Sequence, residues 1–192
     1  MARPREFDVD KVIAALKETF WLKGYEGASY ADLTAATGLK KGSLYAAFGD
    51  KRALYLKALE DYNDREVSGG VALLTDSSGA SDGRKRIETL LGMVADAVRN
   101  GDRRGCLLCD AASDQAQLDP IVEKAVSASF MRIQNAFAHC LADMSQNPIK
   151  GDAAQRTASW LTSVYFGMRI MAKAGAPLAM LEEVHDVTLE KL

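Results

Sequence analysis

The chain has 192 residues, of which 48% are hydrophobic and 26% are charged, as is typical of a soluble globular protein. No apolar run is as long as a membrane span, and three cysteines, an odd number, argue against a disulfide framework. Residues 1–6 are charged and lack the apolar region of a secretory signal, so we expect a cytoplasmic protein.

The net charge of −2 is unevenly distributed along the chain. Residues 1–60 contain 10 Lys+Arg and 8 Asp+Glu, whereas residues 61–192 contain 14 and 18. Only the N-terminal part is basic, and it is weakly so. Binding of a nucleic acid by this part would therefore depend on a few well-positioned side-chain contacts rather than on a large net positive charge.

The first predicted helix begins after Asp8, a favourable N-cap residue, and runs to about Lys23, where Gly24 ends it. Apolar residues recur in it at steps of three and four, the stripe of an amphipathic helix: Val12, Ile13, Leu16, Phe20 and Trp21. We interpret this helix as the support for the segment that follows, with its aromatic residues in the core.

Two short helices joined by a tight turn are predicted between residues 29 and 51. Ser29 and Asp32 form a capping-box-like start for the first of them. Gly38 is the residue most able to take a positive φ at its C-terminus, and the second helix then runs to Gly49. Two helices of under about ten residues joined in this way make a helix-turn-helix.

Three lysines lie at helix starts in this segment. Lys40 and Lys41 open the second helix and Lys51 opens the next, although a helix N-terminus already carries about half a positive charge. A phosphate group would compensate for this arrangement, since helix N-termini and lysines both bind phosphate. The alternative is that these lysines are simply solvated, with Asp50 offsetting one of them.

The segment D-L-T-A-A-T-G-L-K-K-G-S-L-Y-A-A-F-G-D-K, residues 32–51, resembles the TetR family of bacterial repressors. The resemblance extends more loosely over residues 7–59. It implies an all-α protein of about nine helices, with a three-helix, helix-turn-helix DNA-binding head. The head would occupy residues 1–52, and a helical effector-binding and dimerisation body would occupy residues 53–192.

The candidate DNA-binding residues cluster around the turn and the start of the second helix, whose N-terminal residues face the major groove in this motif. They are Ser29, Lys40, Lys41, Gly42, Ser43, Leu44, Tyr45 and Lys51. Lys41 can donate to guanine, and Ser43 can bond to either base type. Ala46 and Ala47 stand where many family members carry a large aromatic residue and a histidine, so we expect base readout to be concentrated in Lys41 and Ser43.

The rest of the chain is predicted to be helical. A helix that starts at Asp50 links the head to the body and reaches about Ser68, where Gly69-Gly70 breaks or bends it. After a loop at residues 77–83, further helices are expected at residues 84–100, 105–117, 119–145 and 152–174, and a last one begins at Ala176-Pro177. Asp119 and Asp152 are the predicted caps of two of these helices.

The helix at residues 152–174 indicates a homodimer. From Trp160 to Ala172 it is apolar nearly all round, with Arg169 as its one charge, so it must be buried on more than one side. A two-fold dimer would bury it and would let two heads read the half-sites of a palindromic operator. The candidate interface residues are Trp160, Val164, Gly167, Met171 and Leu181.

An effector pocket is implied by the family resemblance alone. The candidates for its walls are Met93, Phe130, Phe137, Tyr165 and Met168. If these side chains line a pocket, its apolar and aromatic surface predicts a small hydrophobic or aromatic effector. The expected function is a ligand-released repressor of double-stranded DNA operators; a constitutive DNA-binding regulator with a filled core is one alternative.

Cys106 and Cys109 have C-x-x-C spacing. A zinc site would need two further ligands, and a thioredoxin-like motif would need a βαβ context, so we expect neither. The favoured interpretation is a pair of small core residues; a thiol-responsive regulator is the other alternative. His139 and His185 are isolated and no catalytic motif is present, so no enzyme activity, metal or cofactor is expected.

Overall fold

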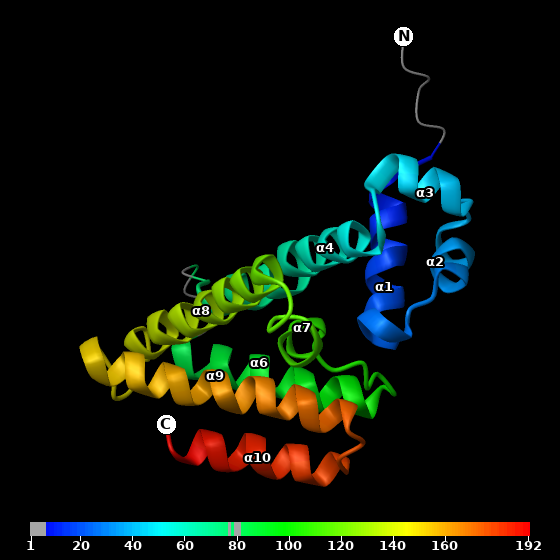
Figure 1. Cartoon of the computed structure of the whole chain (residues 1–192). Coiled ribbons are helices and arrows are strands. Elements are labelled where there is room, and N and C mark those ends of the chain that lie inside the picture. The colour runs from blue at the N-terminus through cyan, green and yellow to red at the C-terminus, as the bar shows by residue number, and fades with distance from the viewer. Residues whose placement is uncertain (1–6, 77, 79–81) are drawn as a thin grey trace.

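The computed structural model describes residues 7–76, 78 and 82–192, so most of the predicted loop at residues 77–83 lies outside the described residues. Within these ranges all regular structure is helical (Figure 1). The elements are α1 (Val9–Gly27), α2 (Tyr30–Thr37), α3 (Lys41–Phe48), α4 (Lys51–Tyr62), the π-helical segment η1 (Asn63–Val67), α5 (Ser68–Leu74), α6 (Gly83–Arg99), α7 (Leu107–Asp114), α8 (Pro120–Ala142), α9 (Gly151–Lys173) and α10 (Leu178–Glu190). The predicted all-α class with a three-helix head is confirmed.

Helices α1, α2 and α3 form the head around a small apolar core (Figure 1). Its fully buried side chains include Leu16, Phe20, Leu33 and Leu44. Asp8 caps α1 as predicted, because its carboxylate accepts hydrogen bonds from the backbone N–H groups of Asp10 and Lys11. Gly24 interrupts the helical conformation at φ 71, also as predicted, although a further turn continues to Gly27.

The rod made of α4, η1 and α5 connects the head to the body (Figure 1). The predicted break at Gly69-Gly70 is wrong, because α5 passes through both glycines and ends at Leu74. A Cβ atom at Gly70 would lie 3.6 Å from side-chain atoms of both Ile133 in α8 and Leu90 in α6. A Cβ atom would thus make only ordinary van der Waals contact there, and the helix continues through both glycines because α5 packs against α6 and α8.

The irregularity in the rod lies earlier, at η1, and is tied to α8 by polar side chains. The Ser68 hydroxyl donates to the carbonyl oxygen of Asn63 (3.1 Å). The amide oxygen of Asn63 accepts from the Ser129 hydroxyl (2.9 Å) and from the Arg132 guanidinium (2.8 Å). Insertions of this kind are frequent at functional sites, and this one lies where the rod passes from the head to the body.

The body is built on the antiparallel pair α8 and α9, with α6 and α10 packed beside α9, and α7 lies between α8 and the head helix α1 (Figure 1). Asp119 caps α8 and Pro120 occupies its first turn, as predicted. The predicted cap of α9 is wrong: Lys150 is the N-cap residue, and Asp152 lies in the first turn, where its charge suits the helix dipole. None of the helices in the described ranges is long and apolar enough to cross a membrane.

Candidate nucleic-acid interface and effector cavity

Local structure defines both ends of α2. Ser29 Oγ accepts from the N–H of Asp32 (3.2 Å), and the Asp32 carboxylate accepts from the N–H of Ser29 (2.9 Å), which confirms the predicted capping box. The hydrogen bond from Lys23 to Asp32 (2.6 Å), together with those from Ser29, lowers the pKa of Asp32 to about 2. Gly38 then ends α2 in the left-handed conformation (φ 69), as predicted.

The start of α3 is exposed and lacks a side-chain cap. Lys40 occupies the N-cap position without a side-chain hydrogen bond to the helix, and Lys41, Gly42 and Ser43 are exposed. An uncapped helix N-terminus beside two lysines is an arrangement that suits a phosphate group. Leu44, by contrast, is fully buried, so its side chain holds α3 against the head core instead of facing outward.

Two tyrosines and a lysine form a cluster beside this helix start. The ring centres of Tyr30 and Tyr45 lie 5.3 Å apart, and the Lys41 ammonium lies 4.3 Å from the Tyr30 ring centre and 5.6 Å from that of Tyr45. A hydrogen bond with Tyr30, together with some burial, raises the pKa of Tyr45 to about 12. Tyr45 therefore remains a neutral phenol that can donate a hydrogen bond to an anion.

Lys51 lies at the first position of α4, as predicted, and its backbone is hydrogen-bonded to a side chain of the head. Its N–H donates to the Tyr30 hydroxyl (3.2 Å), while its ammonium lies 3.5 Å from the carbonyl oxygen of Glu26 and 4.7 Å from the Tyr25 ring centre. Tyr30 is absent from the predicted DNA-binding residues. Its contacts with both Lys41 and Lys51 arise only when α2, α3 and α4 are packed together, so no local sequence signal marks it.

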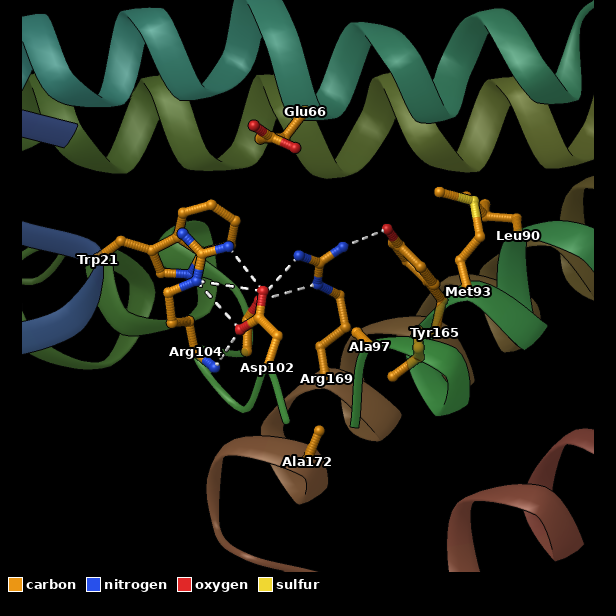
Figure 2. Close-up of a pocket in the computed structure, with 12 residues that line it drawn as sticks. Trp21, Glu66, Leu90, Met93, Ala97, Asp102, Arg104, Tyr165, Arg169 and Ala172 are labelled. Carbon is orange, nitrogen blue, oxygen red and sulfur yellow. Dashed lines mark hydrogen bonds and ion pairs between the residues drawn. The ribbon is translucent and has the colours of Figure 1, made fainter. Parts of the chain in front are cut away.

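A cavity of about 270 Å³ lies where the head meets the body (Figure 2). It is lined by Trp21, Glu66, Leu90, Met93, Val94, Ala97, Asp102, Arg104, Gly105, Tyr165, Arg169 and Ala172. Figure 2 shows Glu66, on the rod, facing Arg104 and Arg169 across the cavity, with Trp21 toward one end and Met93 toward the other. The charged groups therefore lie in the middle of the cavity and at its Trp21 end, where Arg104 covers the ring, and the Met93 end is apolar.

Two of the five predicted pocket residues, Met93 and Tyr165, line this cavity. The other three are core side chains outside it: Phe137 and Met168 are almost completely buried, and the ring of Phe130 lies 4.5 Å from that of Phe166. The cavity lining is also more polar than the sequence predicts, because four of its twelve residues are charged. Those charged residues come from η1, the α6–α7 connection and α9.

The α6–α7 connection, residues 100–106, links the cavity directly to the head. The guanidinium of Arg104 lies over the Trp21 ring, 4.0 Å from its centre, and forms an ion pair with Glu18. Asp102 holds the other side of the same guanidinium at 2.6 Å. Two side chains of α1 are thus bound by a residue that also forms part of the cavity wall.

Most predicted dimer-interface residues share one face of α9. Trp160, Val164, Gly167 and Met171 recur at steps of four, three and four, and each is half-buried in the single chain. Further large apolar side chains are exposed on the same pair of helices: Ile170 on α9, and Met180 and Val187 on α10. Leu181 differs, because it is fully buried within the chain and packs in the core.

Comparisons with known proteins agree with this architecture. A model of the family described as bacterial regulatory proteins, tetR family, matches residues 12–58, which span α1 to most of α4. Over 98% of both chains, this protein is 30% identical to the TetR family transcriptional regulator CifR, of which a cysteine mutant was solved in complex with a 26-base-pair operator DNA, and the TM-score is 0.77. The fold and its head therefore define a helix-turn-helix transcriptional regulator.

Two further relatives cover nearly the whole chain. The chain is 26% identical to the uncharacterized HTH-type transcriptional regulator YezE of Bacillus subtilis over 100% of both proteins. It is 29% identical to the HTH-type transcriptional repressor ComR of Escherichia coli, over 97% of this chain and 90% of that protein. The chain belongs to the TetR family, and the family predicted from residues 32–51 is confirmed.

Proposed function

We propose that this protein is a homodimeric repressor that binds a palindromic operator and is released by a small molecule in the cavity between head and body. The observation that carries the proposal is that the cavity wall includes Trp21, a residue of the DNA-binding head, beside residues of the body. A ligand there would contact both parts at once. It could therefore change the position of the head relative to the body.

In the proposed complex, the exposed start of α3 enters the major groove. Lys41 and Ser43 read base edges, while Lys40, Tyr45 and Lys51 contact phosphates. These basic groups are few, in keeping with the weak excess of positive charge in residues 1–60. The affinity for DNA therefore depends on how well each contact is positioned rather than on total charge. Two heads about 34 Å apart along the duplex would engage half-sites one turn apart.

The dimer is proposed to form through the apolar face of α9 and α10. Trp160, Val164, Gly167 and Met171 lie on that face. Ile170, Met180 and Val187 on the same two helices are exposed in the single chain, and a partner subunit would cover this group of apolar side chains. A two-fold interface would fix the separation of the two heads. We expect the protein to act in the cytoplasm and to catalyse no reaction.

The effector is proposed to be amphipathic rather than purely hydrophobic. Its apolar part would lie against Trp21 or Met93, and its polar part against Glu66, Arg104 and Arg169. A ligand that binds more tightly to the released form than to the DNA-bound form weakens DNA binding by the ratio of its two affinities. Typical coupling of this kind is about 1–3 kcal/mol.

Two alternatives to ligand release are a constitutive DNA-binding regulator and a thiol-responsive regulator. The cavity favours ligand release over a constitutive regulator, because a small molecule bound there would contact both head and body. The second is supported by the position of Cys106 and Cys109, both buried beside Arg169 and a second cavity. Thiol modification and ligand binding are compatible in one protein.

The DNA-binding part of the proposal can be tested by selecting duplexes from a random library with the full-length protein. The expected result is enrichment of a palindromic sequence that binds two chains per duplex. A Lys41→Ala, Ser43→Ala double variant should enrich a different sequence or none. Failure of the unaltered protein to enrich any sequence, or enrichment of a site without two-fold symmetry, would contradict the proposal.

A further inference from the structure

Arg169, in the wall of the cavity between head and body, has no carboxylate at ion-pair distance among the described residues (Figure 2). Its guanidinium donates to the carbonyl oxygen of Gly105 (2.8 Å) and to the hydroxyls of Tyr165 (2.7 Å) and Tyr62 (3.1 Å). All three of these partners are neutral, whereas an arginine keeps its charge in proteins. Because a cation removed from water is costly without an anion nearby, this part of the cavity favours a negatively charged ligand.

The two carboxylates of the cavity wall are already paired with other cations. Asp102 accepts hydrogen bonds from Nε (3.0 Å) and Nη2 (2.6 Å) of Arg104. The side-chain hydrogen bond with Arg104 is the largest cause of the lowered pKa of Asp102, and the charge of Arg169 contributes less. Glu66 forms an ion pair with Lys17 of the head (3.4 Å). A ligand anion at Arg169 would therefore displace neutral groups rather than an acid of the wall.

The donors of Arg169 are not all used. A guanidinium has five N–H groups. Nε and Nη2 donate to Gly105, Nη2 also donates to Tyr62, and Nη1 donates to Tyr165. The second N–H of Nη1 has no acceptor within the part of the chain that the structure describes. A carboxylate can accept from both Nη atoms at once, and such charge-assisted hydrogen bonds are roughly twice as strong as neutral ones, so it would replace a tyrosine hydroxyl.

Gly105 holds the guanidinium in position. It adopts the left-handed conformation (φ 73), and a Cβ atom there would lie 2.8 Å from the carbonyl oxygen of Arg169. The absence of a side chain thus lets the α6–α7 connection approach α9 closely enough for its carbonyl to accept from two nitrogens of Arg169. Since the cation is already oriented, ligand binding requires little further ordering of its side chain.

The cavity offers apolar surface next to this cation. Figure 2 shows Leu90 and Met93 of α6 on the side of the Arg169 guanidinium where Tyr165 lies, opposite Asp102. The cavity volume of about 270 Å³ is larger than the cavities of about 150 Å³ that hold a benzene molecule. It therefore has room for an aromatic ring together with a short chain that ends in a carboxylate.

We propose that the cavity binds a small organic acid, with its carboxylate on Arg169 and its apolar or aromatic tail against Leu90 and Met93. This names the chemical class of the effector. The recognition of the acid stands on the cavity alone, whereas its effect on DNA binding rests on the proposed function.

Tyr62 connects Arg169 to the head. It is the last residue of α4, and its ring packs edge-to-face with that of Trp21 in α1, with the ring centres 4.9 Å apart. The Tyr62 hydroxyl donates to the sulfur of Cys106 (3.5 Å), so toward Arg169 it acts as an acceptor that a carboxylate can replace. Loss of this hydrogen bond would free Tyr62 to shift against Trp21. Binding of an acid would therefore change the contact between the rod and the head.

The recognition is tested by calorimetric titration of the full-length protein with three compounds that share one tail: phenylpropionate, phenylpropionamide and phenylpropylamine. The acid should bind at least tenfold more tightly than the amide, because only the acid forms hydrogen bonds to Arg169 that are charged on both sides. The amine should bind more weakly than the acid. An acid that does not bind, or binds no more tightly than the amide, would overturn the proposal. A preference for the amine would also overturn it and would assign recognition to Glu66.

Two variants locate the carboxylate. Arg169→Gln should bind the acid and the amide with affinities within about twofold of each other, whereas Lys173→Gln should keep the preference for the acid. Lys173 is the matched control because it lies one turn further along α9 and pairs with Asp110. A preference for the acid that persists in Arg169→Gln would contradict the assignment.

Tyr62→Phe decides the question even if Arg169→Gln does not fold, because it keeps the ring that packs against Trp21 and removes only the hydroxyl. It should bind the acid about threefold more tightly, since the carboxylate no longer has to displace a hydrogen bond. Unchanged or weaker binding of the acid by Tyr62→Phe would count against the proposal.

The regulatory consequence is tested separately with a duplex selected from a random library by the protein without ligand. The acid should weaken binding to this duplex at least fivefold, and by a smaller factor in Tyr62→Phe. If the acid binds through Arg169 but the affinity for DNA is unchanged, the recognition stands and its link to release is wrong. If no duplex is enriched in the first place, the proposed function fails, and the titrations still decide whether the cavity binds organic acids.

Discussion

Arg104 lies over the ring of Trp21, with its guanidinium 4.0 Å from the ring centre, and the same guanidinium forms an ion pair with Glu18. One side chain of the body thus holds two residues of the head helix α1. A second connection lies at the start of the rod, where Arg52 donates to both carboxylate oxygens of Asp119, the N-cap residue of α8. These two contacts tie the head to the body at separate points.

Replacing Arg104 with alanine should weaken the connection between cavity and head. The stacking and the ion pair together are expected to be worth about 0.5–2 kcal/mol of unfolding free energy, since the site is partly exposed. A matched control is Arg99→Ala, because Arg99 pairs with Asp96 and Glu182 within the body. Urea denaturation should show a larger loss for Arg104→Ala. An equal loss in the two variants would mean that the contact with Trp21 contributes nothing beyond a surface ion pair.

Lys51 is expected to contribute a phosphate contact. Lys51→Ala should weaken binding to selected and random duplexes by similar factors, because phosphates carry no sequence information. The slope of log affinity against log salt concentration should decrease by about one unit. Lys57→Ala is the control, since Lys57 is exposed on the same helix and pairs with Glu60. Identical slopes for Lys51→Ala and the unaltered protein would reject Lys51 as a phosphate contact.

Ser43 is expected to affect which DNA sequence is preferred rather than the electrostatic attraction between the protein and DNA phosphates. Its side chain is exposed at the start of α3, and serine can donate to or accept from base edges. Ser43→Ala should change the preferred base at one position of each half-site, at a cost of about 1–3 kcal/mol, and leave the salt slope unchanged. Duplex selection with the variant measures this directly. An unaltered preferred sequence would place base readout elsewhere in the head.

The head could be predicted largely from sequence because its determinants are local. The capping box of Ser29 and Asp32, the left-handed Gly38 and the lysines at helix starts all depend on residues a few positions apart. The cavity could not be predicted in this way. Its walls come from α1, η1, α6, the α6–α7 connection and α9, and the charged members become neighbours only after these elements pack together.

The corrections in the body have a similar origin. Gly69-Gly70 carries a helix-breaking signal, yet the helix continues because packing of α5 against α6 and α8 overrides the low helix propensity of glycine. Leu181 lies on an apolar helix like the other predicted interface residues, but the position of α10 buries it inside the chain. Periodicity shows that a face is apolar; it does not show whether that face meets its own core or a second subunit.

The capping box predicts a specific dependence on pH. The pKa of Asp32 is lowered in the folded protein, so its contribution to stability is fully present above the unfolded pKa near 4 and is lost as the pH falls through about 2. Asp32→Asn should therefore be less stable than the unaltered protein at pH 7, and the difference should shrink below pH 4. Thermal unfolding from pH 7 to pH 2 measures it. A difference that stays constant over this range would rule out the carboxylate charge as its source.

The central claim, that occupancy of the cavity controls DNA binding, is tested most directly by measuring both affinities of one thermodynamic cycle. A compound found by thermal-shift screening, and shown to lose binding in Tyr165→Ala, would be titrated with and without the selected duplex, and the duplex would be titrated with and without the compound. The predicted result is that each ligand weakens the other by the same factor, about 5- to 150-fold. A compound that occupies the cavity while both affinities stay unchanged would contradict the claim.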